Sequence, residues 1–236
     1  MFPGEVLEAA RAHAREEYPR ESVGLVVDGR YQREENVAED PENEFLIASG
    51  EYPPGLQAVI HSHPGAHGRE PSRADMEGQR ATAVPWGIIP MYDADDARPV
   101  RMGNIVWFGD QVPIPPLLGR EFLGGVADCY SLVRDYYRLD RGVVLPNFPR
   151  DRAWWLEGPS MFTDERLGKA GFRRVGLDEL KAGDSVTFTI NSKIINHCGV
   201  YIGKGLLLHH LWNRLSRREP LGPWLKCAGS GWRIKP

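Results

Sequence analysis

The sequence predicts two consecutive domains of the mixed α+β or α/β class, each with a β-sheet flanked by helices. Three observations indicate this class. Helix-like and strand-like patterns are mixed in both halves of the chain, a proline- and glycine-rich run separates the halves, and the charge balance changes sign across that run. At 236 residues the chain is long enough for two domains of ordinary size.

The first half of the chain predicts a helix, two strands, a second helix and a buried strand. The first helix covers residues 4–17, because its apolar residues recur on one face: Val6, Leu7, Ala10 and Ala14. Strands are predicted at 22–27 and 56–62. A helix follows from about Ser72 to Thr82, and "WGIIPMY" at 86–92 is an apolar strand.

Residues 109–120, "GDQVPIPPLLGR", contain three prolines and two glycines with no hydrophobic periodicity. Such a run is typical of a linker. We therefore place the first domain at residues 1–110, the linker at 111–119 and the second domain at 120–236.

The second domain predicts a helix that begins at Cys129, "CYSLVRDYYR", with Leu132, Val133 and Tyr136 on one face. Further helix is expected within the Arg- and Trp-rich stretch 150–175. Three strand-like runs close the chain: 184–190, 198–203 and 206–212.

Charge and hydropathy exclude some classes of function. Residues 1–110 hold 20 Asp and Glu against 10 Lys and Arg, whereas residues 111–236 hold 12 against 19, so their net charges are −10 and +7. The basic residues are scattered and no nucleic-acid motif accompanies them, so we expect no nucleic-acid partner. No apolar run approaches the roughly 20 residues that cross a bilayer, so we expect no membrane partner either.

The N-terminal segment is too charged to be a secretion signal. We expect the protein to be made in a cytoplasm without a signal peptide. Three cysteines cannot form a disulfide framework, so at least one of them is free for a chemical role.

A first candidate site lies in "HSHPGAHGREPSRAD", residues 61–75. Alternate residues of a strand face the same side, so His61 and His63 can point at one metal ion. Asp75, in the first turn of the following helix, can supply a third ligand. Three protein ligands with one open position for water are typical of a catalytic zinc, Zn²⁺.

The same residues have a purely structural interpretation. Ser72 followed by Asp75 is also a good start for a helix, with Ser72 as the N-cap and Asp75 completing a capping box. His67 or Glu70 could replace one of the proposed ligands. Spacing alone does not decide between these alternatives.

Together with the preceding "PRESVGLVV" and the following "VPWGII", the pattern resembles the JAMM/MPN metalloprotease family. The resemblance implies a cytidine-deaminase-like sheet flanked by helices and a zinc ion bound by His61, His63 and Asp75. It also implies that Glu21 acts as general acid/base and that Ser72 stabilises the tetrahedral intermediate. One departure is a spacing of eight residues between His63 and Ser72, where the family has seven.

A second candidate site begins at Cys129, which follows a glycine-containing loop and opens a helix with Asp128 as the possible N-cap. The positive end of the helix dipole lowers the pKa of a thiol and favours the nucleophilic thiolate. His197 can act as its base. The structural alternative is an ordinary buried cysteine, as we expect for Cys198, which faces the other side of the strand from His197.

The residue that orients His197 depends on the turn between two antiparallel strands. A two-residue turn, Gly203 and Lys204, would bring His210 to His197. A three-residue turn that includes Gly205 would bring His209 to the His197 face.

"DCYSLVRDYY", "LKAGDSVTFTI" and "NHCGVYIGKGLLLHH", in this order, resemble the NlpC family of papain-like α+β cysteine peptidases. The resemblance implies that Cys129 is the nucleophile and His197 the base. The orienting residue follows the base by twelve positions in that family, which here selects His209.

The combination of both domains resembles the tail-tip assembly proteins of lambda-like siphophages. It implies a tail-tip peptidase of the virion that cleaves peptidoglycan stem peptides, near a D-glutamyl–diaminopimelate bond, and that contacts other tail-tip proteins. The zinc-dependent half would cleave a peptide or isopeptide bond of a tail protein during assembly. The alternatives are an assembly protein with vestigial sites and a bacterial wall-remodelling hydrolase.

Overall fold

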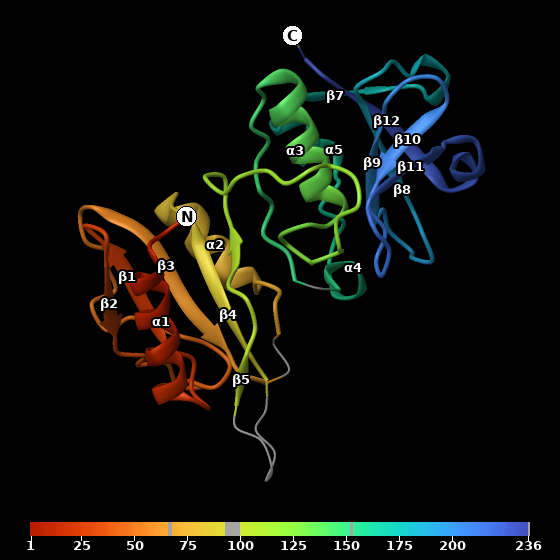
Figure 1. The fold of residues 1–236 in the computed structure, drawn as a ribbon. Coiled ribbons are helices and arrows are strands. Elements are labelled where there is room, and N and C mark those ends of the chain that lie inside the picture. Colours follow the sequence, from red (N-terminus) through yellow and green to blue (C-terminus); the bar gives the residue numbers. More distant parts are fainter. Residues whose placement is uncertain (66–67, 93–99, 152, 236) are drawn as a thin grey trace. The chain divides into compact units, whose positions relative to one another are not determined.

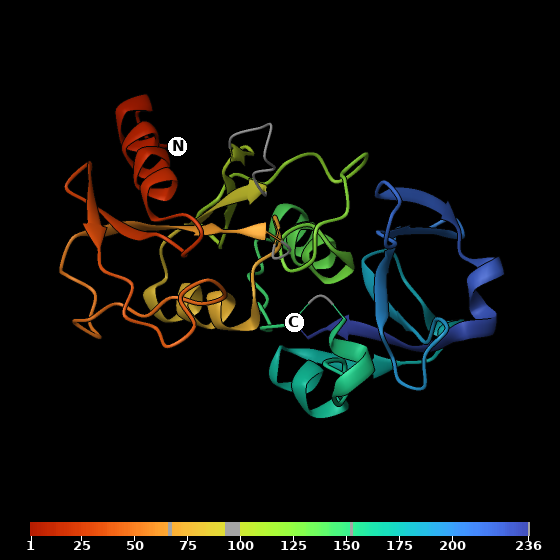
Figure 2. The ribbon, with the colours of Figure 1, turned by 90° about the horizontal axis from the view of Figure 1, so that it is seen from below.

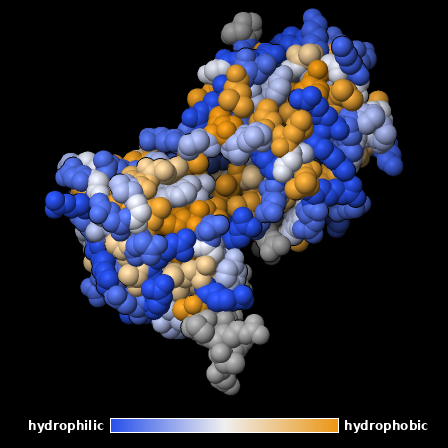
Figure 3. Space-filling view, viewed as in Figure 1, coloured by the Kyte–Doolittle hydropathy of each residue, from blue (hydrophilic) through white to orange (hydrophobic). Residues whose placement is uncertain are grey.

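The computed structural model describes residues 1–236 except 66–67, 93–99, 152 and 236. The chain divides into two compact units, Met1–Pro113 and Ile114–Pro236. The division falls inside the proline-rich run that sequence predicts as a linker. No helix among the described residues is long and apolar enough to cross a membrane. Hydrophilic side chains cover much of the visible face of both units, with smaller apolar groups between them (Figure 3).

The first unit is a mixed sheet flanked by helices (Figure 1). Its strand order is β2-β1-β3-β4-β5, β6 pairs with β4, and only the β3–β4 pairing is parallel among the described strands. The elements are α1 (Gly4–Glu17), β1 (Val23–Val27), β2 (Arg30–Glu34), β3 (Leu56–His63), α2 (Arg73–Thr82), β4 (Trp86–Tyr92), β5 (Arg101–Met102) and β6 (Val106–Phe108). The sequence prediction of α1, α2, β1, β3 and β4 is confirmed, and β2, β5 and β6 are additional.

Helices α1 and α2 lie on opposite faces of this sheet (Figure 2). The α1 face buries the predicted Val6, Ala10 and Ala14 against Ala58 and Ile60 of β3, whereas Leu7 is only half-buried. Because side chains alternate along a strand, His61 and His63 point to the other face, where α2 lies. The parallel β3–α2–β4 crossover therefore carries the residues of the first candidate site.

The second unit is a six-stranded antiparallel sheet with helices (Figure 1). Its strand order is β11-β10-β9-β8-β12-β7. The helical elements are α3 (Cys129–Arg141), α4 (Trp154–Glu157), α5 (Asp164–Lys169), η2 (Leu177–Glu179) and η3 (Gly222–Cys227). The strands are β7 (Phe172–Val175), β8 (Asp184–Phe188), β9 (His197–Tyr201), β10 (Leu206–His209), β11 (Arg217–Pro220) and β12 (Ala228–Ile234).

The structure corrects one expectation for the second unit. The strands predicted at 184–190, 198–203 and 206–212 correspond to β8, β9 and β10, but they do not close the chain, because β11 and β12 follow. β12 lies between β8 and β7 in the sheet, so the last strand is an internal one. The further helix predicted within 150–175 is confirmed by α4 and α5, and β7 at the end of that stretch is additional.

Both faces of the second sheet are buried. Side chains of α3, including Tyr130, Val133 and Tyr137, form a core with Cys198 and Val200 of β9. On the other face, Val186, Phe188 and Leu207 form a smaller core with Leu221, which precedes η3. Burial of Cys198, which is 1% exposed, confirms that this cysteine faces the core.

Candidate functional sites in the two units

Three potential metal ligands come together where β3 ends and α2 begins. The Nε2 atoms of His61 and His63 are 3.0 Å apart. An Asp75 carboxylate oxygen lies 3.3 Å from each of these nitrogens, Oδ1 from His61 and Oδ2 from His63. All three residues are buried. They form the one cluster of potential ligands found among the described residues.

The spacing and chemistry of these atoms fit a divalent metal ion. Bonds of about 2.0–2.1 Å in tetrahedral geometry place ligand atoms about 3.3 Å apart, close to the distances observed here. Two imidazoles and one carboxylate also leave a fourth position for water or substrate. Glu70 is outside the cluster, and the alternative ligand His67 lies outside the described residues.

Burial and the neighbouring charges shift the pKa values of the carboxylates in and beside this cluster. Phe45 and Trp86 contact the His61 ring, with centroid distances of 4.9 and 5.7 Å. Although burial opposes the shift, His61 and His63 hold the pKa of Asp75 well below its ordinary value. Burial raises the pKa of Glu21 to about 8. A bound cation would favour the charged form of Glu21 and counteract that effect of burial.

Glu21 lies at the edge of the cluster, with its Oε1 3.8 Å from Nε2 of His63. Its backbone is fixed by Asn36, whose side-chain amide donates to the carbonyls of Glu21 and Glu44 at 2.9 and 3.0 Å. The Asn36 amide oxygen accepts from the N–H groups of Ala38 and Leu46. Asn36 therefore ties the loop before Leu46 to the backbone of Glu21, whose carboxylate faces the potential metal ligands.

Ser72 has the structural role that the sequence offered as an alternative. Its hydroxyl accepts from the Asp75 N–H at 3.1 Å, and the Asp75 carboxylate accepts from the Ser72 N–H at 2.7 Å. This capping box does not exclude a metal site, because it orients the Asp75 carboxylate toward the histidines. The Ser72 side chain is exposed, so its hydroxyl is also accessible from solvent.

In the second unit, Cys129 is the first residue of α3, and Asp128 is its N-cap. The Asp128 carboxylate accepts from the Ser131 N–H at 2.8 Å and from the Gly125 N–H at 2.9 Å. Arg150 donates to both oxygens of this carboxylate, at 2.6 and 2.9 Å, and also to the Ser131 hydroxyl. The loop before the cysteine and the first turn of its helix are thus fixed by one buried ion pair.

His197 and His209 lie on one face of the second sheet and are hydrogen-bonded. Gly199 is paired with His209 across β9 and β10, so His197 is the diagonal neighbour of His209. The His197 Nε2 and His209 Nδ1 atoms are 3.0 Å apart. The connection is the three-residue one, Gly203–Gly205, because Ile202 donates to Leu206 across it. His210 instead contacts the Arg214 carbonyl and the Phe122 ring.

Gly199 allows the two histidines to meet. A Cβ atom at position 199 would lie 2.8 Å from the His209 Cβ and 2.8 Å from the Leu208 carbonyl oxygen. Such distances are shorter than van der Waals contact, and the carbonyl cannot move without disturbing the β10 ladder. A side chain at this position would therefore displace His209.

The Cys129 thiol has the electrostatics of a nucleophile. The neighbouring Cys198 thiol and the His197 imidazole lower the pKa of Cys129 to about 5, although burial acts in the opposite direction. Burial raises the pKa of Cys198 itself well above its ordinary value. Cys129 is therefore the cysteine of this pair that ionises first.

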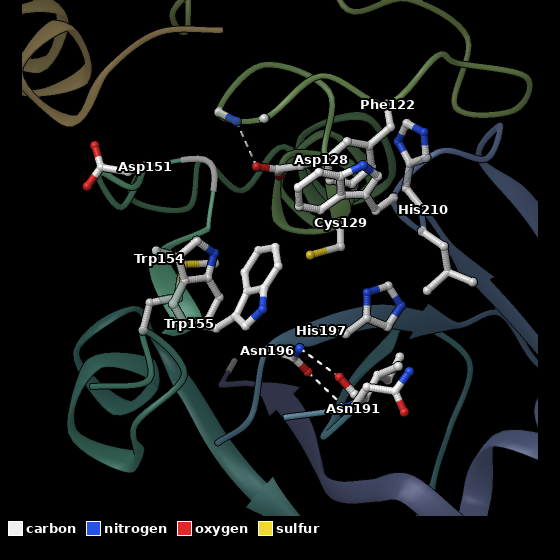
Figure 4. Close-up of a pocket in the computed structure, with 16 residues that line it drawn as sticks. Phe122, Asp128, Cys129, Asp151, Trp154, Trp155, Asn191, Asn196, His197 and His210 are labelled. Carbon is white, nitrogen blue, oxygen red and sulfur yellow. Dashed lines mark hydrogen bonds between the residues drawn. The ribbon is translucent and has the colours of Figure 1, made fainter. Parts of the chain in front are cut away.

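A pocket of about 240 Å³ opens onto Cys129 and His197. Both side chains lie next to each other at this pocket in Figure 4. Aromatic rings form much of the lining: Phe122, Trp154, Trp155 and Trp212. Asp128, Asp151, Asn191, Asn196 and His210 supply polar groups. Through this pocket, a segment of a small peptide can reach the Cys129 thiol, although the residue is only 8% exposed.

Sequence reasoning missed Arg150, Asn36 and Glu219, which contact the predicted site residues. The His209 Nε2 and Glu219 Oε1 atoms are 2.6 Å apart. Alternation along "RREP" puts Arg217 and Glu219 on one strand face, which was the available signal for Glu219. No strand was predicted there, so that signal was not used.

Replacement of Gly199 tests the close approach of the two histidine strands. For Gly199→Ala we expect a loss of about 1–3 kcal/mol in the free energy of unfolding, because the new methyl group overlaps the His209 Cβ and the Leu208 carbonyl. Chemical denaturation measures this loss. The control is Gly229→Ala, also in a strand, where the nearest atom to the new Cβ is 3.5 Å away. Equal stability of the two variants would contradict the steric explanation.

Replacement of Arg150 tests its buried ion pair with Asp128, the N-cap of α3. Arg150→Met leaves the Asp128 carboxylate buried without its cationic partner, so we expect a loss of about 3–5 kcal/mol in the free energy of unfolding. Arg173→Met, at an exposed position of β7, should stay within about 0.5 kcal/mol of wild type. A loss in Arg150→Met no greater than in Arg173→Met would show that the pair contributes nothing.

Comparison with known proteins identifies both units. Residues 3–102 match the prokaryotic homologues of the JAB domain, and residues 116–228 match the NlpC/P60 family. Tail tip assembly protein K of Escherichia phage N15 is 31% identical over 226 residues, which cover 92% of this chain and 88% of that protein. Tail tip assembly protein K of Escherichia phage lambda is 36% identical over 179 residues, covering 75% and 81%.

Among solved structures, an NlpC/P60 family protein from Bacillus cereus ATCC 10987 is 13% identical, with a TM-score of 0.35 over 96% of this chain and 67% of that one. A similarity this low adds nothing to the assignment. The assignment rests instead on the sequence matches to the two domain families and to the phage proteins. The chain belongs to the family of phage tail tip assembly protein K, with an N-terminal JAB-type domain and a C-terminal NlpC/P60 domain.

Proposed function

We propose that the C-terminal domain is a cysteine endopeptidase that cleaves the stem peptides of peptidoglycan at the D-glutamyl–diaminopimelate bond. The observation that carries this proposal is the arrangement of Cys129 at the start of α3, His197 beside it and His209 hydrogen-bonded behind His197. A nucleophile, a base and an orienting group in contact are the set that acyl transfer by a thiol requires.

The reaction begins with attack of the Cys129 thiolate on the scissile carbonyl carbon. The developing oxyanion is stabilised by backbone N–H groups at the start of α3, including that of Cys129. Protonated His197 then gives its proton to the leaving amine, and the C–N bond breaks. Water, deprotonated by His197, attacks the resulting thioester and releases the new carboxylate together with the thiolate.

The setting of this reaction is the tail tip of a phage. The relatives are named tail tip assembly proteins, and we infer that this chain also associates with tail-tip proteins of the virion. A tail carries the enzyme to the cell wall, so the activity does not depend on secretion by the host. The net charge of +7 on residues 111–236 favours approach to an anionic wall polymer, an attraction that salt weakens.

The N-terminal domain is proposed to be a zinc-dependent peptidase or isopeptidase that acts on a tail protein during assembly. His61, His63 and Asp75 would hold the ion, which when bound lowers the pKa of a coordinated water toward about 7. Glu21, whose Oε1 lies 3.8 Å from His63 Nε2, would take and return a proton beside these ligands. The Ser72 hydroxyl can donate to an oxyanion, because its bond to the Asp75 N–H uses only a lone pair.

Replacement of the nucleophile tests the cysteine peptidase. Cys129→Ala removes the thiol proposed to form the thioester, so we expect it to release no peptides from purified sacculi, as measured by mass spectrometry of the soluble products. Cys227→Ala, which alters a cysteine outside the pocket, should retain wild-type release. Peptide release by Cys129→Ala at the wild-type rate would refute the assignment. Phage that carry Cys129→Ala and infect normally, while deletion of the domain blocks tail formation, would favour a purely structural role.

Metal analysis tests the N-terminal site. After zinc supplementation and removal of free metal, the wild-type protein should retain about one zinc ion per chain, and Asp75→Asn and His63→Ala should retain none. Glu77→Gln, which alters an exposed carboxylate on the same helix, is the matched control and should bind zinc normally. At a free zinc concentration of about 100 times Kd, binding should stabilise the wild-type domain by about 2.7 kcal/mol. A supplemented wild-type protein without metal would contradict the proposal.

A further inference from the structure

Glu219 adds a third residue to the hydrogen-bonded series that begins at His197 and continues to His209. It lies on β11, which pairs with β10 so that Glu219 is opposite Leu207 and diagonal to His209. Its Oε1 atom is 2.6 Å from His209 Nε2, and His209 Nδ1 is 3.0 Å from His197 Nε2. Glu219 does not line the pocket at Cys129, so it can act on the reaction only through the histidines.

The donors and acceptors in this series can be assigned in order. A carboxylate only accepts hydrogen bonds, so the proton between Glu219 and His209 belongs to His209 Nε2. Burial and the neighbouring His197 lower the pKa of His209 to about 4, although Glu219 acts in the opposite direction. Near neutral pH, His209 is therefore uncharged and holds a single ring proton, on Nε2, which leaves its Nδ1 as an acceptor.

The same reasoning fixes the tautomer of His197. Because His209 Nδ1 accepts, the proton between the two rings belongs to His197 Nε2. The other ring nitrogen of His197, Nδ1, is then the atom that exchanges a proton with Cys129. The Nε2–H group of His197 donates to His209 in both states of the Cys129–His197 pair, thiol with imidazole and thiolate with imidazolium. A proton can therefore move between the Cys129 sulfur and His197 Nδ1 without any change in the hydrogen bonds to His209 and Glu219.

Aromatic side chains and an arginine hold the two histidines and Glu219 in their hydrogen-bonded orientations. The Trp224 ring, on η3, packs edge-on against His209 with a centroid distance of 4.9 Å, and Phe188 contacts His197 at 5.7 Å. His209 is fully buried, and hydrogen bonds are stronger where water is excluded. Arg217 lies 3.3 Å from the second Glu219 oxygen, Oε2, which leaves Oε1 directed at His209.

We propose that Glu219 is a positioning residue that fixes the tautomers of His209 and His197 and thereby directs His197 Nδ1 to the Cys129 sulfur. This inference rests on the proposed cysteine peptidase function. It adds a fourth member to the predicted set of three and gives β11 a role in the chemistry of a site that it does not touch.

Imidazole nitrogen NMR of the whole protein, with stem-peptide kinetics on the same samples, tests this inference. Wild type should show His209 and His197 protonated on Nε2. Glu219→Leu removes the acceptor, so the neutral His209 ring should show mixed tautomers, and kcat should fall about tenfold or more while KM stays within about twofold, because the pocket is unchanged. Glu219→Gln retains an oxygen acceptor and should keep the wild-type tautomers. Arg218→Leu, exposed on the same strand, is the matched control and should match wild type in both measurements.

The two measurements separate the inference from the function on which it rests. If wild type cleaves no stem peptide, the peptidase proposal fails, but the tautomers still decide the role of Glu219. Wild-type protein with His209 protonated on Nδ1, or Glu219→Leu protein with unchanged tautomers, overturns the inference. Unchanged kcat in a folded Glu219→Leu variant overturns it as well.

Discussion

The contact between the Cys129 thiol and the His197 imidazole at the start of α3 is the interaction on which the proposed chemistry of the C-terminal domain depends. A buried thiolate is unfavourable unless groups around it favour the negative charge. Here the Cys198 thiol and His197 do so, and Cys129 lies at a helix N-terminus, where the dipole favours negative charge. The Asp128–Arg150 pair fixes the loop and the first turn that hold the sulfur in place, and the sheet supplies the imidazole.

Both domains build their sites in a similar way, although their folds and chemistry differ. In each, a strand carries one or two histidines and the first turn of a helix carries the partner, Asp75 in α2 and Cys129 in α3. A capped helix start is well suited to this task because its backbone is fixed by side-chain hydrogen bonds and its dipole favours negative charge. The capping box at Ser72 and the N-cap at Asp128 are therefore parts of the sites and not alternatives to them.

Local patterns in the sequence were sufficient for much of this picture. Period-two alternation predicted that His61 and His63 share a face, and the helix-start signals at Ser72 and Asp128 placed Asp75 and Cys129 in first turns. Turn chemistry alone left two candidates for the partner of His197, because a one-residue change in the turn moves every side chain to the other face. The resemblance to the NlpC family selected His209, and the strand register brings His209 to His197. The long-range contacts of Arg150 had no local signal, since they depend on a loop conformation. The alternation that puts Glu219 on the same strand face as Arg217 was present in the sequence, but it could be used only once β11 was known.

Titration of the Cys129 thiolate by its ultraviolet absorbance, as the difference between wild type and Cys129→Ala, measures the central interaction directly. The difference removes the contributions of Cys198 and Cys227. A thiolate that half-titrates at a pH of about 5 would agree with a thiol paired to His197 at a helix start. Half-titration at about 8.5, the ordinary value of a free cysteine, would show that the sulfur is not activated and would contradict a nucleophilic role for it.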